Sequence, residues 1–368
     1  MNHSSDLSFN ITQLPLELLV RIAEYLFTRD VLRLSLCSKY LHEILYLVEF
    51  NVKVKFVDIC NLSYFDSFTN IFYEFNKIKF KFSRKLKVLS WYSHMKRVPE
   101  LPASLTHLTL GSNHVGLLPQ LPNSLTYLIL SKCYNLQFSE LPVSLEYLEL
   151  GERYNKPLPQ LPVTLKYLIL GRSYEHGFLE FPTLLTYLKL GHEYNAKLPQ
   201  LPNSLSYLEL GFRYNQPFSQ LPNALISLKL DSCYEHKLPQ LPDSLRRLKL
   251  GSNYNHVFSK LPNSLEIFET GYIYNRPLPR LPTLLRKLSI GYSHNQPLPE
   301  FPDSLISLNV CFCPYYNHIL PRLPDSIKKL KLSGYYDQSF PNMPASLEIL
   351  ITHRENKITN VPANVMIR

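Results

Sequence analysis

A repeat of twenty residues constrains this chain more than any other feature. Its opening dipeptide occurs at Leu101–Pro102 and then every twenty residues to Phe301–Pro302. It returns at Leu323–Pro324 after a two-residue insertion, and again at Met343–Pro344 and Val361–Pro362. A period this regular indicates a stack of similar coils that contact their neighbours, because one such coil cannot bury its own apolar side chains.

The unit reads L-P-x-S-L-x-x-L-x-L-G-x-x-Y-N-x-x-L-P-Q, with leucine at positions five, eight and ten. In one copy these are Leu145, Leu148 and Leu150. Positions eight and ten share one face of a strand, so we expect a strand of about five residues in each coil. Prolines near both ends fix the backbone and leave no room for a helix. The sequence therefore predicts an α+β multi-domain chain whose larger part is a leucine-rich-repeat-like parallel β solenoid with an extended, helix-free convex side.

Two further positions predict the turns between coils. Glycine follows the strand, as at Gly151, and we expect it to permit a sharp departure of the chain. Asparagine stands at position fifteen, as at Asn155, where its amide can bond to backbone. Stacked in register, the asparagines could form a ladder between neighbouring coils.

Position seven faces outward on the strand side and is tyrosine in five consecutive coils. Tyrosine is enriched at protein-binding hot spots. Stacked aromatic rings also stabilise a sheet by cross-strand contact, so both interpretations stay open. Farther along, the face becomes basic. The candidate target-binding residues are Tyr127, Tyr147, Glu149, Tyr167, Tyr187, Lys189, Tyr207, Lys229, Arg247 and Lys249. A second tyrosine series at position fourteen hardly varies, which favours a packing role.

The first fifty residues do not repeat and have a helical pattern. Leu14, Leu18, Ile22 and Leu26 recur at four-residue spacing and predict one apolar stripe. We expect Asp30 to cap a second helix and Ser38 to cap a third. So short a helical segment buries little of its own surface. The stripe could bind a partner or pack on the first coil, and the pattern alone does not decide between them.

Composition bounds the remaining possibilities. The net charge is +10, and residues 51–100 hold ten Lys or Arg against four Asp or Glu. A basic segment can contact nucleic acid, but scattered charge is usually a solvated surface, so we do not expect a nucleic-acid partner. The six cysteines do not follow the repeat, which favours a reducing compartment, and we expect a cytoplasmic protein without a signal peptide or membrane span. The predicted boundaries are a flexible segment 1–13, a helical domain 14–50, a basic connector or cap 51–81, and a solenoid 82–368.

Both parts resemble known families. The recurring "LPxSLxxLxLGxxYNxPLPQLP" is similar to the FNIP repeat, a leucine-rich-repeat relative of social amoebae and giant amoeba viruses. The pattern "LPLELLVRIAEYLFTRDVLRLSLCSK" resembles a small three-helix F-box, which implies binding to a Skp-type adaptor and thereby to a cullin ubiquitin ligase. The adaptor-facing positions implied by this resemblance are Leu14, Pro15, Leu18, Leu19, Ile22, Asp30, Leu36 and Cys37. If the chain is viral, the resemblance implies the host cytoplasm.

No catalytic motif stands out, and we expect no catalytic residue, cofactor or metal. Cys311, Cys313 and His318 give three ligand types without a clear fourth, which makes a poor zinc site. The favoured hypothesis is a non-enzymatic substrate receptor of a Skp–cullin–F-box ubiquitin ligase, monomeric apart from the ligase complex, whose solenoid binds an unidentified target protein. The alternative is a protein-binding scaffold that uses the solenoid alone.

Overall fold

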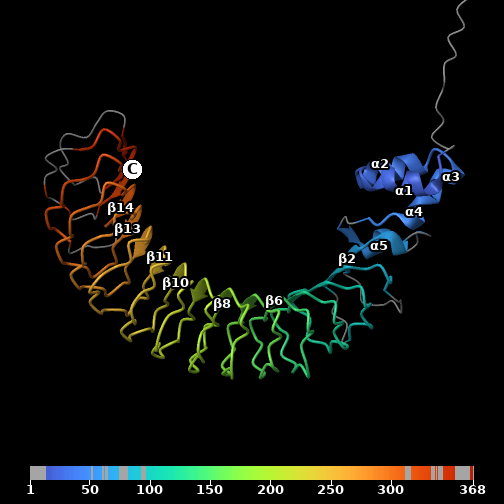
Figure 1. The fold of residues 1–368 in the computed structure, drawn as a ribbon, viewed down its shortest axis with the longest axis horizontal. Coiled ribbons are helices and arrows are strands. Elements are labelled where there is room, and N and C mark those ends of the chain that lie inside the picture. The colour runs from blue at the N-terminus through green and yellow to red at the C-terminus, as the bar shows by residue number, and fades with distance from the viewer. Residues whose placement is uncertain are drawn as a thin grey trace, which may run out of the picture. The chain divides into compact units, whose positions relative to one another are not determined.

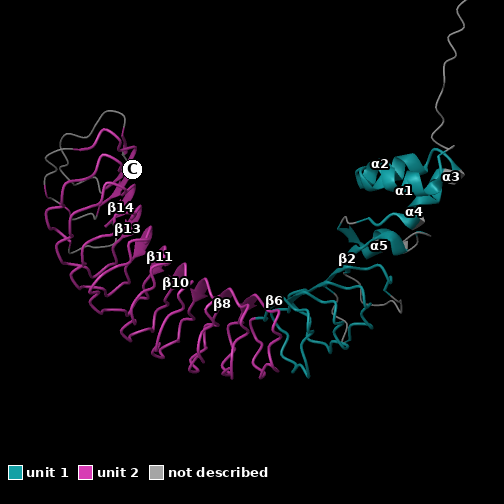
Figure 2. Ribbon diagram, viewed as in Figure 1, with its two compact units in different colours: residues 1–151 teal, residues 152–368 magenta. Residues whose placement is uncertain are grey.

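The computed structural model describes residues 14–50, 53–59, 62, 65–73, 82–92, 97–310, 316–332, 336, 338, 343–352 and 365–367 (Figure 1). The predicted flexible segment 1–13 lies outside these residues, as do Cys311 and Cys313. The chain forms two compact units, Met1–Gly151 and Glu152–Arg368 (Figure 2), and each is described by itself.

The first unit begins with four short helices. They are α1 (Leu16–Glu24), α2 (Thr28–Ser35), α3 (Lys39–His42) and α4 (Ile44–Leu47). A small apolar core holds them together, and its fully buried members are Leu19, Val31, Leu41, Ile44 and Leu45. The predicted helical domain is therefore present, and its own leucine, isoleucine and valine side chains form its core.

One of the two predicted helix caps is confirmed. The Leu41 amide donates to Ser38 Oγ at 3.1 Å, where α3 begins. The prediction for Asp30 is wrong, because α2 starts at Thr28 and Asp30 already lies in its first turn. There its carboxylate lies 3.7 Å from the Arg33 guanidinium, and a negative charge in a first turn favours the helix.

A parallel sheet follows the helices within the first unit. Its strands are β1 (Val54–Lys55), β2 (Asn70–Tyr73), β3 (Val88–Trp91), β4 (His107–Leu110), β5 (Tyr127–Ile129) and β6 (Tyr147–Glu149), with α5 (Phe56–Ile59) and the 3-10 helix η2 (Phe65–Ser67) after β1. Each strand pairs with the next in sequence.

This sheet begins earlier than the sequence predicts. β2 pairs with β3 so that Ile71 lies beside Leu89 and Tyr73 beside Trp91, and the last two rings stack at 4.4 Å. The segment 51–81 therefore supplies the first strands of the sheet, and the predicted boundary at residue 82 needs correction. Sequence reasoning missed these strands because they have aromatic and β-branched residues without the Leu-Pro signature.

The second unit is a ladder of parallel strands (Figure 2). Its strands are β7 (Tyr167–Ile169), β8 (Tyr187–Lys189), β9 (Tyr207–Glu209), β10 (Ser227–Lys229), β11 (Arg247–Lys249), β12 (Ile267–Glu269), β13 (Lys287–Ser289), β14 (Ser307–Asn309), β15 (Lys329–Lys331), β16 (Ile349–Ile351) and β17 (Met366–Ile367). The described residues of this unit contain no helix, as predicted for the solenoid.

The typical strand has three residues rather than the five that the sequence predicts. Tight turns enclose it on both sides. The Leu185 amide donates to Pro182 O at 3.1 Å, and the Tyr194 amide donates to Gly191 O at 3.2 Å. Because both turns use backbone groups within one coil, the extended part contracts to positions seven to nine.

The core is made of the repeat's leucines and the second tyrosine series. In one coil of the second unit Leu185, Leu188 and Leu190 are at most 3% exposed, and Tyr194 is fully buried. Tyr194 lies between Tyr174 and Tyr214 in a column of near-parallel rings, with centroids 6.3 and 6.2 Å apart. The predicted packing role of position fourteen is therefore confirmed.

Glycine after the strand is required by close approach between coils. A Cβ atom on Gly191 would lie 2.0 Å from Gly171 O, and one on Gly211 would lie 1.7 Å from Gly191 O. These glycines do not have the left-handed backbone that the expectation of a sharp turn involves. Because glycine has no side chain, the backbones of adjacent coils can lie in direct contact at this position.

Two polar ladders complete the stack. The predicted asparagine ladder is present. The backbone N–H of Asn215 donates to Asn195 Oδ1 at 2.8 Å, and the backbone N–H of Asn295 donates to Asn275 Oδ1 at 2.8 Å. A second ladder was not predicted. At position four, Ser264 Oγ donates to the carbonyl of Leu245 in the previous coil at 2.8 Å, and other serines repeat this bond. The serine of the repeat is thus a link between coils.

Candidate protein-binding surfaces

Helix α1 has an apolar stripe that faces away from the helical core. Leu18 is 46% exposed, Ile22 is 39% exposed and Leu26, just beyond the helix, is 40% exposed. Leu19 and Ala23 face inward and are buried. The helix therefore has apolar residues on two sides, of which only one is used within the first unit. Exposed apolar stripes of this kind are typical of protein-interaction sites.

More exposed apolar residues flank the helices. Leu36, which ends α2, is 83% exposed, and Phe27, which precedes this helix, is also 83% exposed. Tyr25 is exposed by 91%. The folded helical domain does not bury these side chains, so they are available to a partner.

A row of stacked rings lies on the strand face of the first unit. Tyr127 stacks between His107, at 5.3 Å, and Tyr147, at 4.3 Å. The Tyr147 hydroxyl donates to Glu149 at 2.9 Å. Burial, with the neighbouring Glu149 carboxylate, raises the pKa of Tyr147. This hydroxyl therefore stays protonated over the whole neutral range and can donate a hydrogen bond.

The strand face of the second unit begins with three more tyrosines. Tyr167 and Tyr207 are 44% and 40% exposed, and Tyr187 lies between them with ring centroids 6.0 and 6.1 Å away. The rings are tilted against one another by 30° and 32°. Tyr167 and Tyr207 therefore contact a neighbouring ring and are also exposed to solvent.

Charged side chains at positions seven and nine form two groups of lysine, glutamate and lysine. Glu209 lies 3.4 Å from Lys189 Nζ and 2.5 Å from Lys229 Nζ. Glu269 lies 3.6 Å from Lys249 Nζ and 2.5 Å from Lys287 Nζ. In each group one carboxylate faces two ammonium groups, so each group keeps a net positive charge.

The electrostatics of Glu269 follow from this arrangement. Burial alone would raise its pKa, but the hydrogen bond and charge of Lys287, together with the charge of Lys249, outweigh burial and lower the pKa. Glu269 is therefore ionised at neutral pH and remains so as the solution becomes mildly acidic.

Comparison with protein families identifies both parts of the chain. A family model described as F-box-like matches residues 11–47, and one described as FNIP Repeat matches residues 134–173 and 194–233. The chain carries an F-box-like domain and FNIP repeats. Each FNIP match spans two of the twenty-residue coils.

The solved structures that resemble this protein have leucine-rich repeats. CroV588, described as a circular leucine-rich-repeat protein, is 28% identical with a TM-score of 0.67, over 82% of this chain and 56% of its own. YopM from Yersinia enterocolitica is 25% identical with a TM-score of 0.66, over 82% of this chain and 68% of its own. YopM from Yersinia pestis, a leucine-rich effector, is 23% identical with a TM-score of 0.57, over 81% of this chain and 88% of its own, and shows the fold alone.

This chain spans little more than half the length of CroV588. Among curated proteins, the comparison finds no match. The relatives therefore establish the leucine-rich-repeat solenoid and leave the partners of this chain to be argued from its own surfaces.

The F-box-like domain presents most of the predicted adaptor-facing residues to solvent. Exposed or half-buried positions are held by Leu14, Pro15, Leu18, Ile22, Asp30, Leu36 and Cys37. The prediction that Leu19 faces an adaptor needs correction, because this side chain is fully buried in the helical core. Leu18 and Ile22, which the four-residue spacing places on one stripe, are both exposed. The spacing does not distinguish Leu19 from them, because Leu19 lies one residue from the stripe.

The predicted strand-face residues all lie on the outward side of the sheet. Six of the ten are half-buried, and the other four, Tyr167, Tyr207, Arg247 and Lys249, are exposed. Sequence reasoning missed two stacked aromatic pairs beside this face. His192 stacks on Phe212 at 4.6 Å, and Tyr272 stacks on Tyr292 at 4.6 Å. Their signal was an aromatic residue at position twelve in adjacent coils.

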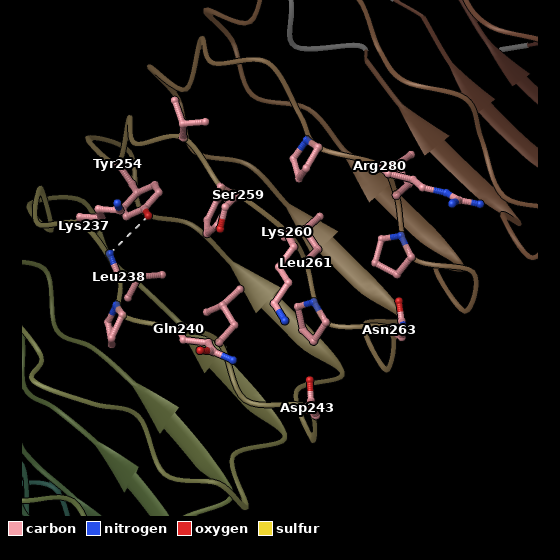
Figure 3. A pocket seen from close by; sticks show the side chains of 18 of the residues that line it. Lys237, Leu238, Gln240, Asp243, Tyr254, Ser259, Lys260, Leu261, Asn263 and Arg280 are labelled. Atoms are coloured by element: carbon pink, nitrogen blue, oxygen red, sulfur yellow. Dashed lines mark hydrogen bonds between the residues drawn. The ribbon is translucent and has the colours of Figure 1, made fainter.

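A hollow lies between the return segments of three successive FNIP coils in the second unit (Figure 3). Its volume is about 880 Å³, and Leu238, Phe258 and Lys260 are among the residues that line it. At its edge the Leu238 amide donates to the Tyr254 hydroxyl at 3.5 Å. Proline at position nineteen of the flanking coils is replaced by Ser259 in the middle coil, and the hollow lies at this change.

Neither a membrane span nor a metal cluster is found in the described part of the chain. None of its helices is long and apolar enough to cross a bilayer. No three His, Cys, Asp or Glu side chains among the described residues are arranged to hold a metal ion. His318 bonds to Asn295 O at 3.3 Å, while Cys311 and Cys313 lie outside these residues.

Proposed function

We propose that this protein is a non-catalytic substrate receptor of a ubiquitin ligase. In this proposal the F-box-like domain binds a Skp-type adaptor, which links it to a cullin, and the repeat solenoid binds the target protein. The observation that carries the proposal is the exposed stripe of Leu18, Ile22 and Leu26 on a domain that matches the F-box-like family. The reducing cytoplasm, of a host cell if the chain is viral, would be its place of action.

The stripe supports adaptor binding because the helical core leaves its apolar side chains exposed. Transfer of apolar surface from water stabilises a complex by about 25 cal/mol per Å². Leu36 at 83% exposed would add to the same kind of contact. Without a partner, these side chains only increase the tendency of the chain to aggregate.

The test uses the full chain and a purified Skp-type adaptor, with binding measured by calorimetry. Leu36→Asp places a charge on a side chain that folding does not use, and Ile22→Asp does so in the middle of the stripe. We expect each change to weaken binding by at least about tenfold, because a buried unpaired carboxylate is costly. Leu179→Asp, at a leucine that is 99% exposed in the second unit, is the matched control and should bind as the natural chain does.

Circular dichroism of each variant separates loss of binding from loss of folding. Adaptor affinity that stays unchanged in both Leu36→Asp and Ile22→Asp would contradict the proposal. The scaffold alternative would then gain support, particularly if deletion of residues 14–48 destabilised the solenoid.

A further inference from the structure

In the basic part of the strand face, cations alternate with uncharged residues at position seven. From β11 to β16, position seven reads Arg247, Ile267, Lys287, Ser307, Lys329 and Ile349, so a cation stands on every second strand. We propose that the strand face of β11–β15 binds an extended acidic segment of the target protein. This inference rests on the proposed function of the solenoid as the target-binding part.

Charge on this face exceeds what its own carboxylate can neutralise. Positions seven and nine of β11–β15 contain the cations Arg247, Lys249, Lys287, Lys329 and Lys331 against the single anion Glu269. Glu269 is shared by Lys249 and Lys287. Arg247, Lys329 and Lys331 have no ion-pair partner among the described residues. The face therefore has a net charge of +4 over five strands, which is complementary to an acidic ligand.

The spacing of the cations fits an extended peptide that crosses the strands. Neighbouring strands lie about 4.8 Å apart, so cations on every second strand recur at about 10 Å. An extended chain in the polyproline II conformation advances about 3.1 Å per residue with three residues per turn, so side chains three residues apart lie on one face at about this spacing. A segment with an acidic side chain at every third position would place one carboxylate over each of Arg247, Lys287 and Lys329.

Glu269 favours a peptide over a nucleic acid. It lies on β12 in the middle of the basic strands and is ionised at neutral pH, since its lysine neighbours lower its pKa. A nucleic-acid backbone has a negative charge at every nucleotide, so one of its phosphates would lie against the Glu269 carboxylate and be repelled by it. A peptide can place neutral residues opposite Glu269 and keep its carboxylates for the cations.

The experiment measures binding of a fluorescent peptide with glutamate at every third residue to the full chain, by anisotropy at low ionic strength. The strand-face variant combines Arg247→Glu, Lys287→Glu and Lys329→Glu. Its matched control combines Lys237→Glu, Lys260→Glu and Arg280→Glu, three cations that line the hollow of Figure 3. Both variants change the net charge equally. We expect the strand-face variant to lose at least about tenfold in affinity and the control less than about threefold, because only the former touches the proposed contacts.

The result has clear alternatives. An equal loss in both variants would show that net charge alone attracts the peptide, and absence of binding to the natural chain would show that the face does not select acidic segments. Either result overturns the inference. So does tighter binding of an oligothymidylate of the same length through the same residues. Adaptor binding is measured on the same preparations, so failure here with adaptor affinity intact would leave the proposed function standing.

Discussion

A single missing side chain decides how closely the coils stack. Gly191 shows the constraint, because a Cβ atom there would lie 2.0 Å from the carbonyl oxygen of Gly171 and 3.1 Å from its carbonyl carbon. Both contacts are with backbone, which cannot rotate away as a flexible side chain can. The repeat therefore keeps glycine here for a reason of space, and the same reason applies to Gly211 and Gly271.

Replacement of this glycine should separate two coils. We expect Gly191→Ala to lower the free energy of unfolding by about 1–3 kcal/mol, the usual cost of overpacking. Gly177→Ala is the control, since its nearest neighbour would be the Ala196 Cβ atom at an ordinary 3.6 Å. It should be neutral or stabilise by up to about 1 kcal/mol, because alanine restricts the unfolded chain. Urea unfolding followed by circular dichroism compares them, and equal midpoints would refute the spatial explanation.

At the scale of the element, a serine at position four of the repeat links several coils to the coil before them. Ser264 Oγ and Ser304 Oγ each donate to the carbonyl of the leucine at position five in the previous coil, at 2.8 and 2.7 Å. At the same position Leu284 is 55% exposed and has no hydroxyl to donate. The stack therefore contains both an example of the bond and a natural gap in the ladder.

These two sites should respond in opposite directions. We expect Ser264→Ala to lower the free energy of unfolding by about 1 kcal/mol, the typical net contribution of one hydrogen bond. Leu284→Ser should raise it by about 0.5–1 kcal/mol, since the new hydroxyl lies within reach of Leu265 O and an exposed leucine is removed. Thermal unfolding measures both. A decrease in both variants would mean that position four acts through packing and not through the bond.

The elements also show what the sequence could predict. Strand positions and buried leucines follow from a period of two inside a period of twenty, so β3 to β16 were predictable from spacing alone. β1 and β2 were not, because Ile71 and Tyr73 fill the leucine positions without flanking prolines. The apolar stripe of α1 was predictable, but the burial of Leu19 depends on how α4 packs against α1, which no local pattern contains.

At the scale of the whole molecule, the two parts differ in how they use their apolar residues. The helical domain leaves Leu18 and Leu36 outside its core, whereas the second unit buries the leucines at positions five, eight and ten of the repeat and its column of tyrosines. This difference fits a division of labour in which the small domain recruits a ligase and the solenoid presents a stable polar and aromatic face.

The buried tyrosines should make the protein sensitive to alkali. Burial raises the pKa of Tyr174 from 10.0 to about 12, and it also raises the pKa of Tyr194 and Tyr254. The same holds for Tyr214, Tyr234 and Tyr274. The folded state therefore binds protons that the unfolded state releases near pH 10. This stability is fully present below pH 10 and is lost as the pH rises toward the folded pKa.

The loss should be large enough to unfold the solenoid. One unit of pKa difference corresponds to about 1.4 kcal/mol, so Tyr174, with its pKa raised to about 12, loses roughly this amount by about pH 11. The pKa values of the other tyrosines of the column are raised in the same direction, so their losses add, against a typical domain stability of about 5–15 kcal/mol. We therefore expect cooperative unfolding near pH 11, with tyrosinate absorbance and circular dichroism changing together. The double variant Tyr174→Phe with Tyr194→Phe removes two titrating groups and should unfold at higher pH. Gradual ionisation of the column with the dichroism unchanged would contradict the prediction, because it would mean that folded coils can hold charged tyrosines.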